Sequence, residues 1–373
     1  MPKRWAEWPV WMRSAVTGIA AAVLAAGAFT TGYRLARPSR SSLTWPAQPA
    51  PVFQPTGAAP FPQFGADPHT HNPVFPAAFT PRWTVPVPGQ AIYQDSYDPT
   101  TGDVYAESMS QTAGWLWAID ARTGRIRWSW QAPNQLMDTP TVADGLVFVG
   151  YGNAQFNPRA MTPHATLDGY YCRGTGVSGV AALDARTGRV VWVARTRGNV
   201  MPTLTYWRGA VYVVGGYTGQ SYSARIWRWT PHAPAEVAAV LPVGTRYAGV
   251  TLFHNRLLVA GGLTPAGRTS AVWSVNLATG SVRAWPPLPT PTAYVTLAAW
   301  QGTVWAVGGD SAHGILDTVL RWDAAEQRWV NAGRLPVPTY YGALVADGAT
   351  LYYLGARTAS GPTAQVWAAA RSR

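Results

Sequence analysis

The chain has 373 residues, of which 47% are hydrophobic and 12% charged, and its formal net charge is +12 at pH 7. This length allows a large core, and the single cysteine, Cys172, excludes an intrachain disulfide and a multi-cysteine metal site. The 20 Trp, 17 Tyr and 37 Gly are typical of an all-β chain with short aromatic strands and tight turns. The arginines form no basic run with interleaved aromatic residues, so nucleic acid is not an expected partner.

The first 36 residues contain an uncharged stretch, residues 15–33, between basic flanks. It is long enough to cross a bilayer as a helix. Two interpretations remain: an uncleaved signal anchor, favoured because Arg34 and Arg37 follow so closely, or a signal peptide cut after Ala26-Gly27-Ala28. The first predicts a single-pass protein of the cell membrane with its bulk on the extracytoplasmic side. The second predicts a secreted protein.

A proline-rich segment follows the apolar stretch. Residues 37–80 carry proline at a density that prevents helix or sheet and favours an extended linker. The chain is therefore expected to divide into a membrane anchor or signal segment (1–36), a linker (37–80) and a globular part (81–373).

The globular part repeats a hydrophobic run that ends in glycine. The first glycines of these runs are Gly215, Gly261, Gly308 and Gly355, spaced 46, 47 and 47 residues apart. A period of that size in a β-rich chain indicates propeller blades, with one four-stranded sheet per repeat. Counting strands along the chain predicts six blades. The last of them lacks one strand, which residues 82–87 are expected to supply, so that the ring closes.

Two repeat families are recognisable within this pattern. The segments 118–128 (AIDARTGRIRW) and 182–192 (ALDARTGRVVW) resemble the repeat of pyrroloquinoline-quinone (PQQ) propellers. In both segments an Asp and a Gly suit a tight turn between the third and fourth strands, and the Trp is expected to pack between blades. The later blades resemble kelch repeats, most clearly in Gly308-Gly309, Trp322 and Trp329. Both resemblances imply a propeller fold and leave the activity open.

The enzymes that these families suggest do not match the residues present. A quinoprotein dehydrogenase implies more blades, a calcium site and often paired cysteines, and a kelch-type copper oxidase implies a Tyr–Cys cross-link with histidine ligands. The histidines here are scattered, and G-x-S-x-G, P-loop and H-E-x-x-H motifs are absent. No cofactor or metal is therefore expected. A kelch-like sugar mutarotase remains as an alternative.

Candidate binding residues gather on one expected face of the ring. The longest insertion, residues 151–178, supplies Arg159, His164, Asp168, Tyr170, Tyr171 and Arg173. The residues that begin successive blades supply Arg246, Tyr247, Tyr294 and Tyr341, with Asp310 on an adjoining loop. Long insertions in compact domains are often functional, and a mixture of Arg, Tyr and Asp suits recognition.

These observations predict an all-β, six-bladed β-propeller closed by an N-terminal strand and preceded by a transmembrane or signal helix. The expected function is a non-catalytic, membrane-anchored binding or scaffolding module whose partner is another envelope or membrane protein. The alternative is an enzyme acting on carbohydrate or a sugar-binding propeller, and a small-molecule ligand stays open.

Overall fold

The computed structural model describes residues 90–98, 100–109, 114–121, 123–136, 138–152, 177–197, 203–217, 221–231, 233–347, 350–354, 356–362 and 367–370. Every helix or strand within these ranges is a β-strand. The expected N-terminal helix, the linker, the closing strand 82–87 and most of the insertion lie outside the described residues. No helix in the described ranges is long and apolar enough to cross a membrane.

Five antiparallel four-stranded sheets form the blades. The first contains β1 (Gln90–Asp98), β2 (Asp103–Met109), β3 (Gly114–Asp120) and β4 (Ile126–Ala132), and the second contains β5 (Thr141–Ala143), β6 (Leu146–Tyr151), β7 (Val177–Asp184) and β8 (Val190–Arg197). The third contains β9 (Thr203–Trp207), β10 (Ala210–Val214), β11 (Arg225–Thr230) and β12 (Ala233–Val240). The fourth contains β13 (Gly249–Phe253), β14 (Arg256–Ala260), β17 (Val272–Val275) and β18 (Val282–Trp285). The fifth contains β19 (Thr296–Trp300), β20 (Thr303–Val307), β23 (Thr318–Asp323) and β24 (Arg328–Arg334).

A three-stranded sheet of β25 (Ala343–Asp347), β26 (Thr350–Leu354) and β29 (Trp367–Ala370) follows the fifth blade. The prediction of six blades is thus corrected to five four-stranded blades, because the described residues supply only three strands to this last sheet. Three short hairpins accompany the later sheets: β15 (Leu263–Thr264) with β16 (Gly267–Arg268), β21 (Asp310–Ser311) with β22 (Gly314–Ile315), and β27 (Arg357–Thr358) with β28 (Gly361–Pro362).

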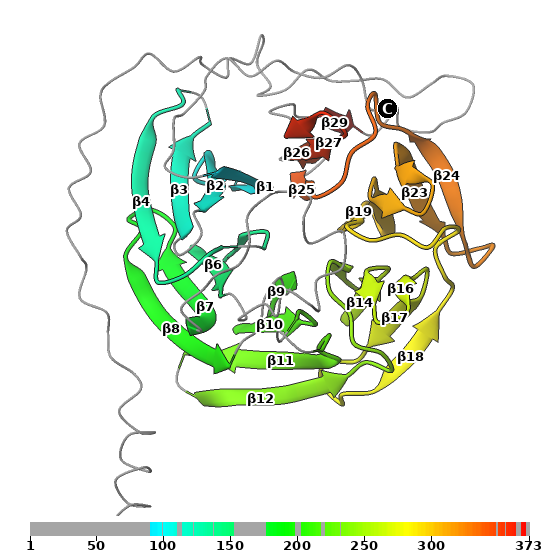
Figure 1. The fold of residues 1–373 in the computed structure, drawn as a ribbon, viewed down its shortest axis with the longest axis horizontal. Helices are drawn as coiled ribbons and strands as arrows, with labels where there is room; N and C mark the ends of the chain where they lie inside the picture. Colours follow the sequence, from blue (N-terminus) through cyan, green and yellow to red (C-terminus); the bar gives the residue numbers. More distant parts are fainter. Residues whose placement is uncertain are drawn as a thin grey trace, which may run out of the picture. The chain divides into compact units, whose positions relative to one another are not determined.

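The first strand of each sheet faces the centre of the ring (Figure 1). Neighbouring inner strands contact one another in the order β1, β5, β9, β13, β19, β25, and β25 returns to β1. This closed order confirms a β-propeller, an arrangement that leaves only short sheet edges exposed. It also places the innermost strands of all six sheets around one central space.

The repeated double glycine is explained by contacts between blades. In three successive blades the second glycine N–H donates to the carbonyl of the threonine that begins the next blade: Gly216 to Thr245 at 2.9 Å, Gly262 to Thr292 at 2.8 Å and Gly309 to Thr339 at 2.8 Å. The first glycines adopt left-handed φ values of 62° to 66°. A Cβ on any of them would collide with the same threonine carbonyls. Only glycine satisfies both constraints.

The turn predicted from the PQQ-like segments is confirmed. The Asp184 carboxylate accepts a hydrogen bond from the Thr187 backbone N–H at 2.9 Å, and Gly188 follows with φ 67°. Trp128, the tryptophan that ends the first PQQ-like segment, donates its indole N–H to the carbonyl of Ala185 in the neighbouring blade at 2.9 Å. The aspartate and glycine therefore form the turn, and the tryptophan joins two blades.

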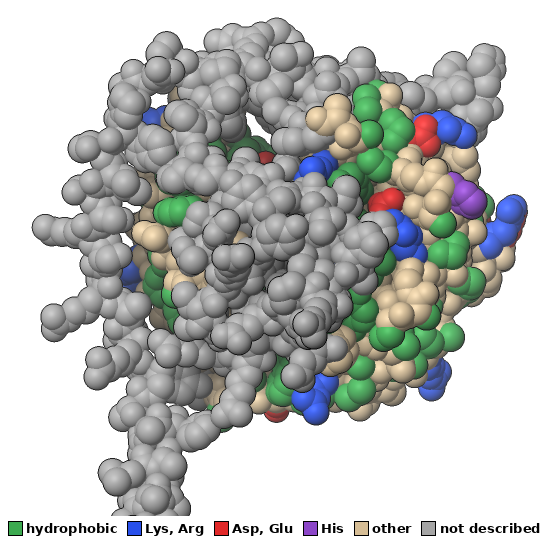
Figure 2. All heavy atoms as spheres, viewed as in Figure 1, with side chains coloured by type: hydrophobic (Ala, Val, Ile, Leu, Met, Phe, Trp, Pro, Cys, Tyr) green, Lys and Arg blue, Asp and Glu red, His purple; other side chains and the backbone are tan. Residues whose placement is uncertain are grey.

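Positive side chains are dispersed over the described part of the visible face (Figure 2). Elsewhere among the described residues arginines pair with acids, as Arg127 does with Asp103 at 2.6 Å and Arg334 with Asp317 at 3.0 Å. Dispersed and paired charge of this kind mainly keeps a surface solvated.

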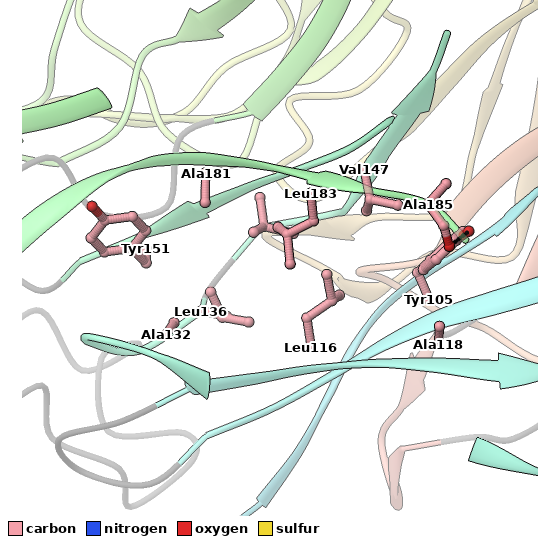
Figure 3. Packing of buried hydrophobic residues seen from close by; sticks show 11 residues of the cluster. Tyr105, Leu116, Ala118, Ala132, Leu136, Val147, Tyr151, Ala181, Leu183 and Ala185 are labelled. Atoms are coloured by element: carbon pink, nitrogen blue, oxygen red, sulfur yellow. Dashed lines mark hydrogen bonds between the residues drawn. The ribbon is translucent and has the colours of Figure 1, made fainter. Parts of the chain in front are cut away.

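The core lies between the blades. Between the first two blades, side chains from β2 and β3 meet side chains from β6 and β7, as Figure 3 shows. Tyr105, Leu116, Leu136 and Leu183 are fully buried there. Burying a large apolar side chain contributes roughly 1.5–3 kcal/mol. The Tyr105 hydroxyl also donates to the Ala185 carbonyl at 3.1 Å, so polar and apolar contacts together fix the two blades.

Candidate functional site

A cavity of about 330 Å³ lies at the centre of the ring. Its wall comes from residues in and just before the six innermost strands. The hydroxyl-bearing residues of this wall are Ser96, Tyr97, Thr139, Thr141, Thr203, Tyr247, Tyr294, Thr296 and Tyr341. None of the described residues that line the cavity is charged. The cavity therefore offers hydroxyl groups and aromatic faces to a small molecule.

Three of these tyrosines occupy equivalent positions, two residues after the buried Thr245, Thr292 and Thr339. Tyr247, Tyr294 and Tyr341 all have left-handed backbone, with φ values of 58°, 58° and 63°. Bulky residues rarely adopt this conformation, and it persists where the surrounding structure imposes it. The blade-to-blade threonine bonds described above lie beside each tyrosine and fix the chain there.

The three side chains form a tyrosine cluster at the end of the cavity where the innermost strands begin. The ring centroids of Tyr247 and Tyr294 are 4.1 Å apart, those of Tyr294 and Tyr341 4.3 Å, and those of Tyr247 and Tyr341 5.5 Å. Burial, followed by the influence of Tyr247, raises the pKa of Tyr294 well above its usual value. The Tyr294 hydroxyl therefore stays protonated near neutral pH and can donate a hydrogen bond.

Arg246 lies behind the tyrosine cluster and is only 5% exposed. Its guanidinium carbon is 4.8 Å from the ring centroid of Tyr247, 5.2 Å from that of Tyr222 and 5.3 Å from that of Tyr217. Tyr217 and Tyr222 pair across a bridge in the third blade, so two blades build this aromatic cage. Burial acts to lower the Arg246 pKa, but the surrounding tyrosines more than offset it and the pKa lies above its usual value. A permanent positive charge thus stands next to an uncharged cavity wall.

An ion pair links the small hairpins on the same side of the ring. Arg268 of β16 pairs with Asp310 of β21, joining the fourth and fifth blades. Both side chains are largely buried, at 18% and 16% exposed. The Asp310 carboxylate thus has its ionic partner in the protein itself, in the neighbouring blade.

The sequence-predicted residues fall into three groups. Arg246, Tyr247, Tyr294 and Tyr341 are brought together, whereas Asp310 belongs to the Arg268 ion pair. The remaining candidates lie outside the described residues: Arg159, His164, Asp168, Tyr170, Tyr171 and Arg173. Cys172 lies there too.

Sequence reasoning missed Tyr217, Tyr222 and Arg268. The sequence feature that could have indicated two of them is their position after a double glycine. Tyr217 directly follows one such pair, and Arg268 follows the equivalent pair by a few residues. The described ranges hold no group of three or more His, Cys, Asp or Glu side chains arranged to hold a metal ion.

Comparison with known proteins supports the propeller assignment. Residues 82–158 match the family described as outer membrane protein assembly factor BamB. The solved structure of YjhT superposes with a TM-score of 0.55 at 16% identity, over 76% of this chain and 95% of that chain. At that identity the likeness concerns the fold.

Curated relatives share shorter stretches. A tetrathionate hydrolase of Acidithiobacillus ferrooxidans is 30% identical over 130 residues, which is 34% of this chain and 26% of that protein. A tetrathionate hydrolase of Acidianus ambivalens is 31% identical over 157 residues, or 39% of this chain and 29% of that protein. Beta-scruin of Limulus polyphemus is 25% identical over 169 residues, 40% of this chain and 18% of that protein. This chain thus spans under a third of each relative.

The expectation of a non-catalytic protein is corrected by these relatives, because two of them are hydrolases. The catalytic motifs considered above are short runs of sequence, whereas Tyr247, Tyr294 and Tyr341 lie on separate blades.

Proposed function

We propose that this protein is an extracytoplasmic propeller enzyme that binds and hydrolyses a small sulfur oxyanion of the tetrathionate class in its central cavity. The observation that carries the proposal is the placement of buried Arg246 behind an uncharged, hydroxyl-lined wall. The stretches shared with two tetrathionate hydrolases favour this substrate class over others.

The hydroxyl groups of the cavity wall can replace the water molecules that an anion loses when it enters the cavity. Among the described residues no carboxylate lines this wall, so an oxyanion in the cavity contacts no negatively charged side chain there. The tyrosine and threonine hydroxyls can donate hydrogen bonds to sulfonate oxygens, and the protonated Tyr294 is a donor at neutral pH. The Arg246 charge acts through the intervening ring of Tyr247 in surroundings of low dielectric constant, where its field is strong.

The same groups can assist hydrolysis. In hydrolysis of a sulfur–sulfur bond, the water oxygen bonds to one sulfur and its proton passes to solvent, while the other sulfur departs with the bonding electron pair and a negative charge. Fixed donors and a nearby guanidinium stabilise charge that develops in a transition state. The role assigned to Tyr247, Tyr294 and Tyr341 is to orient the substrate and to stabilise this charge.

The location and the finer repeat assignment are parts of the same proposal. A membrane anchor at residues 15–33 or a cleaved signal, followed by the linker 37–80, would hold the propeller outside the cytoplasm. Kelch-like repeats in the later blades account for the double glycines. A partner protein in the envelope remains a prediction.

The test is turnover by the purified full chain. Incubation with tetrathionate should consume the substrate and release acid, which a pH-stat and chromatography of the sulfur products measure. Tyr294→Phe should reduce kcat/KM by ~10-fold or more, since it removes one hydroxyl donor. Tyr206→Phe, which removes a hydroxyl bonded to Asp144 on the surface, is the matched control. Absence of both turnover and binding would refute the proposal.

A sugar is the second candidate, favoured by the aromatic faces of the tyrosine cluster. Carbohydrate sites combine such faces with hydroxyl partners. Titration with neutral monosaccharides in a calorimeter separates the two candidates. Binding of a neutral sugar that is independent of salt, with no response to tetrathionate, would assign the cavity to carbohydrate instead.

A further inference from the structure

Three carboxyl groups lie buried where the first blade meets the second. Asp95 belongs to β1, Glu107 to β2, and Asp138 to the connector just before β5. Glu107 and Asp138 are each 1% exposed. The residues that follow Asp95 and Asp138 in the chain, Ser96 and Thr139, line the central cavity. The cluster thus stands directly behind the cavity wall.

Glu107 points toward the second blade. It lies two residues after Tyr105 on the same strand, and alternate residues of a strand share a face. Tyr105 donates to the Ala185 carbonyl across the blade interface, so its face is the one packed on the second blade (Figure 3). Glu107 extends that packed face toward Asp138.

The cluster contains acceptor atoms without donors. Among the described residues, neither carboxyl oxygen of Glu107 has a hydrogen-bond partner, and the same holds for Oδ1 of Asp95 and Oδ1 of Asp138. Asp138 Oδ2 accepts the Gly150 backbone N–H at 2.8 Å. The Asp138 backbone N–H faces the Glu107 carboxyl without reaching hydrogen-bond geometry.

The ionisable groups that act on one another here are all acids. Glu107 interacts with Asp138 and Asp95, while among the described residues Asp95 and Asp138 receive stabilisation only from backbone N–H groups. The ion pairs of the described residues include none of the three. Ionised together, these groups would place like charges in an apolar interface, which is costly.

Protonation relieves this conflict. Burial raises the pKa of Asp95 to about 7. Burial, then repulsion from Asp138 and Asp95, raises the pKa of Glu107 well above its usual value, and burial does the same for Asp138. A protonated carboxyl also gains an O–H donor, which an unpaired carboxyl oxygen beside it can accept.

We propose that Asp95, Glu107 and Asp138 form a proton-operated latch between the first and second blades. Shared protons hold the carboxyls together, and their loss loosens the interface behind the cavity.

The sign of the effect follows from linkage. The folded state binds these protons more tightly than the unfolded chain, so stability decreases as pH rises from about 4 through the folded pKa values. In the full chain, the Tm should fall by on the order of 5 °C or more between about pH 5 and about pH 8.

The test compares this Tm profile with that of Glu107→Gln, which keeps the shape of the side chain and removes its charge. The variant should lose at least about half of the fall in Tm. Glu236→Gln is the control, because Glu236 is 59% exposed and pairs with Arg228 on the surface. An unchanged slope in Glu107→Gln would overturn the proposal.

A second measurement holds even if the variant fails to fold. Infrared spectra of the wild-type full chain near pH 6 should contain the C=O stretch of protonated carboxyl groups, since most free carboxyls are ionised there. The band should weaken as pH rises through about 7, the pKa of Asp95, together with faster hydrogen exchange in β2 and β6. A wild-type protein without that band near pH 6 would have no protonated latch.

Discussion

Tyr247 and Tyr294 begin neighbouring blades, and their ring centroids lie 4.1 Å apart with both backbones at φ 58°. The Tyr294 backbone N–H donates to the Tyr247 carbonyl at 2.8 Å, so backbone and rings are coupled at the same point. The sequence repeat thus places the same left-handed tyrosine in neighbouring blades and brings the two rings into contact. A structural repeat explains the spacing of the tyrosines, and the closed ring explains their convergence on the cavity.

Removing the guanidinium should weaken anion binding. We expect Arg246→Met to reduce affinity for tetrathionate by roughly 10-fold or more and to remove most of its salt dependence, because the positive charge beside the cavity is lost. Calorimetric titration at two salt concentrations measures both effects.

Arg246→Lys serves as the matched comparison for that change. Lysine keeps the charge but cannot place a planar guanidinium against three rings, so an intermediate affinity is expected. Equal affinity of Arg246→Met and the wild type would show that the charge does not act on the ligand.

The double glycines should tolerate no side chain. Gly308 has φ 62°, and an added Cβ would lie 2.5 Å from the Thr339 carbonyl oxygen. Gly302 has φ 75° with nothing within 4 Å of an added Cβ. Gly302→Ala should therefore cost only the ~1–2 kcal/mol of left-handed backbone, whereas Gly308→Ala adds about 1–3 kcal/mol of overpacking.

Denaturant unfolding of the two glycine variants measures this difference. Since both carry the same substitution at similar φ, the difference isolates the contact with the next blade. Equal free energies of unfolding would mean that the Gly308 contact relaxes freely.

The turn at Asp184 should make the free energy of unfolding decrease at low pH. The Thr187 hydroxyl and backbone N–H groups lower the pKa of Asp184 below its usual 3.8. Its contribution is therefore present above that value and is lost as pH falls through the folded pKa. Titration of the Asp184 carboxyl by NMR should show the lowered pKa, and Thr187→Val should raise it toward its usual value. A pKa that does not respond to that substitution would assign the shift to other groups.

The architecture was predictable because it depends on repeated local rules. A glycine pair that must fit under the next blade returns at each repeat, and so do the Asp and Gly of the turn before Trp128 and Trp192. The number of complete blades was not predictable in this way. It depends on strand pairing between residues far apart in the chain, which local patterns do not encode.

The site was predictable only in part. The spacing of Tyr247, Tyr294 and Tyr341 indicated that they meet, because equivalent positions of a ring converge on its axis. The aromatic cage of Arg246 was not foreseen, since Tyr217 and Tyr222 come from the preceding blade. Buried Glu107 was missed for a similar reason. A glutamate within a strand is normally expected to face solvent, and Glu107 is buried only because the second blade packs against its side of the strand.

The hydrogen bonds from glycine to threonine cross from one blade to the next without using the peptide link between them. The ring is consequently held by contacts that do not depend on chain order in its later part. A circularly permuted chain that starts at the fourth blade would keep the bonds of Gly216 to Thr245, Gly262 to Thr292 and Gly309 to Thr339. The later blades of such a permuted chain should therefore assemble with the same contacts between neighbouring blades.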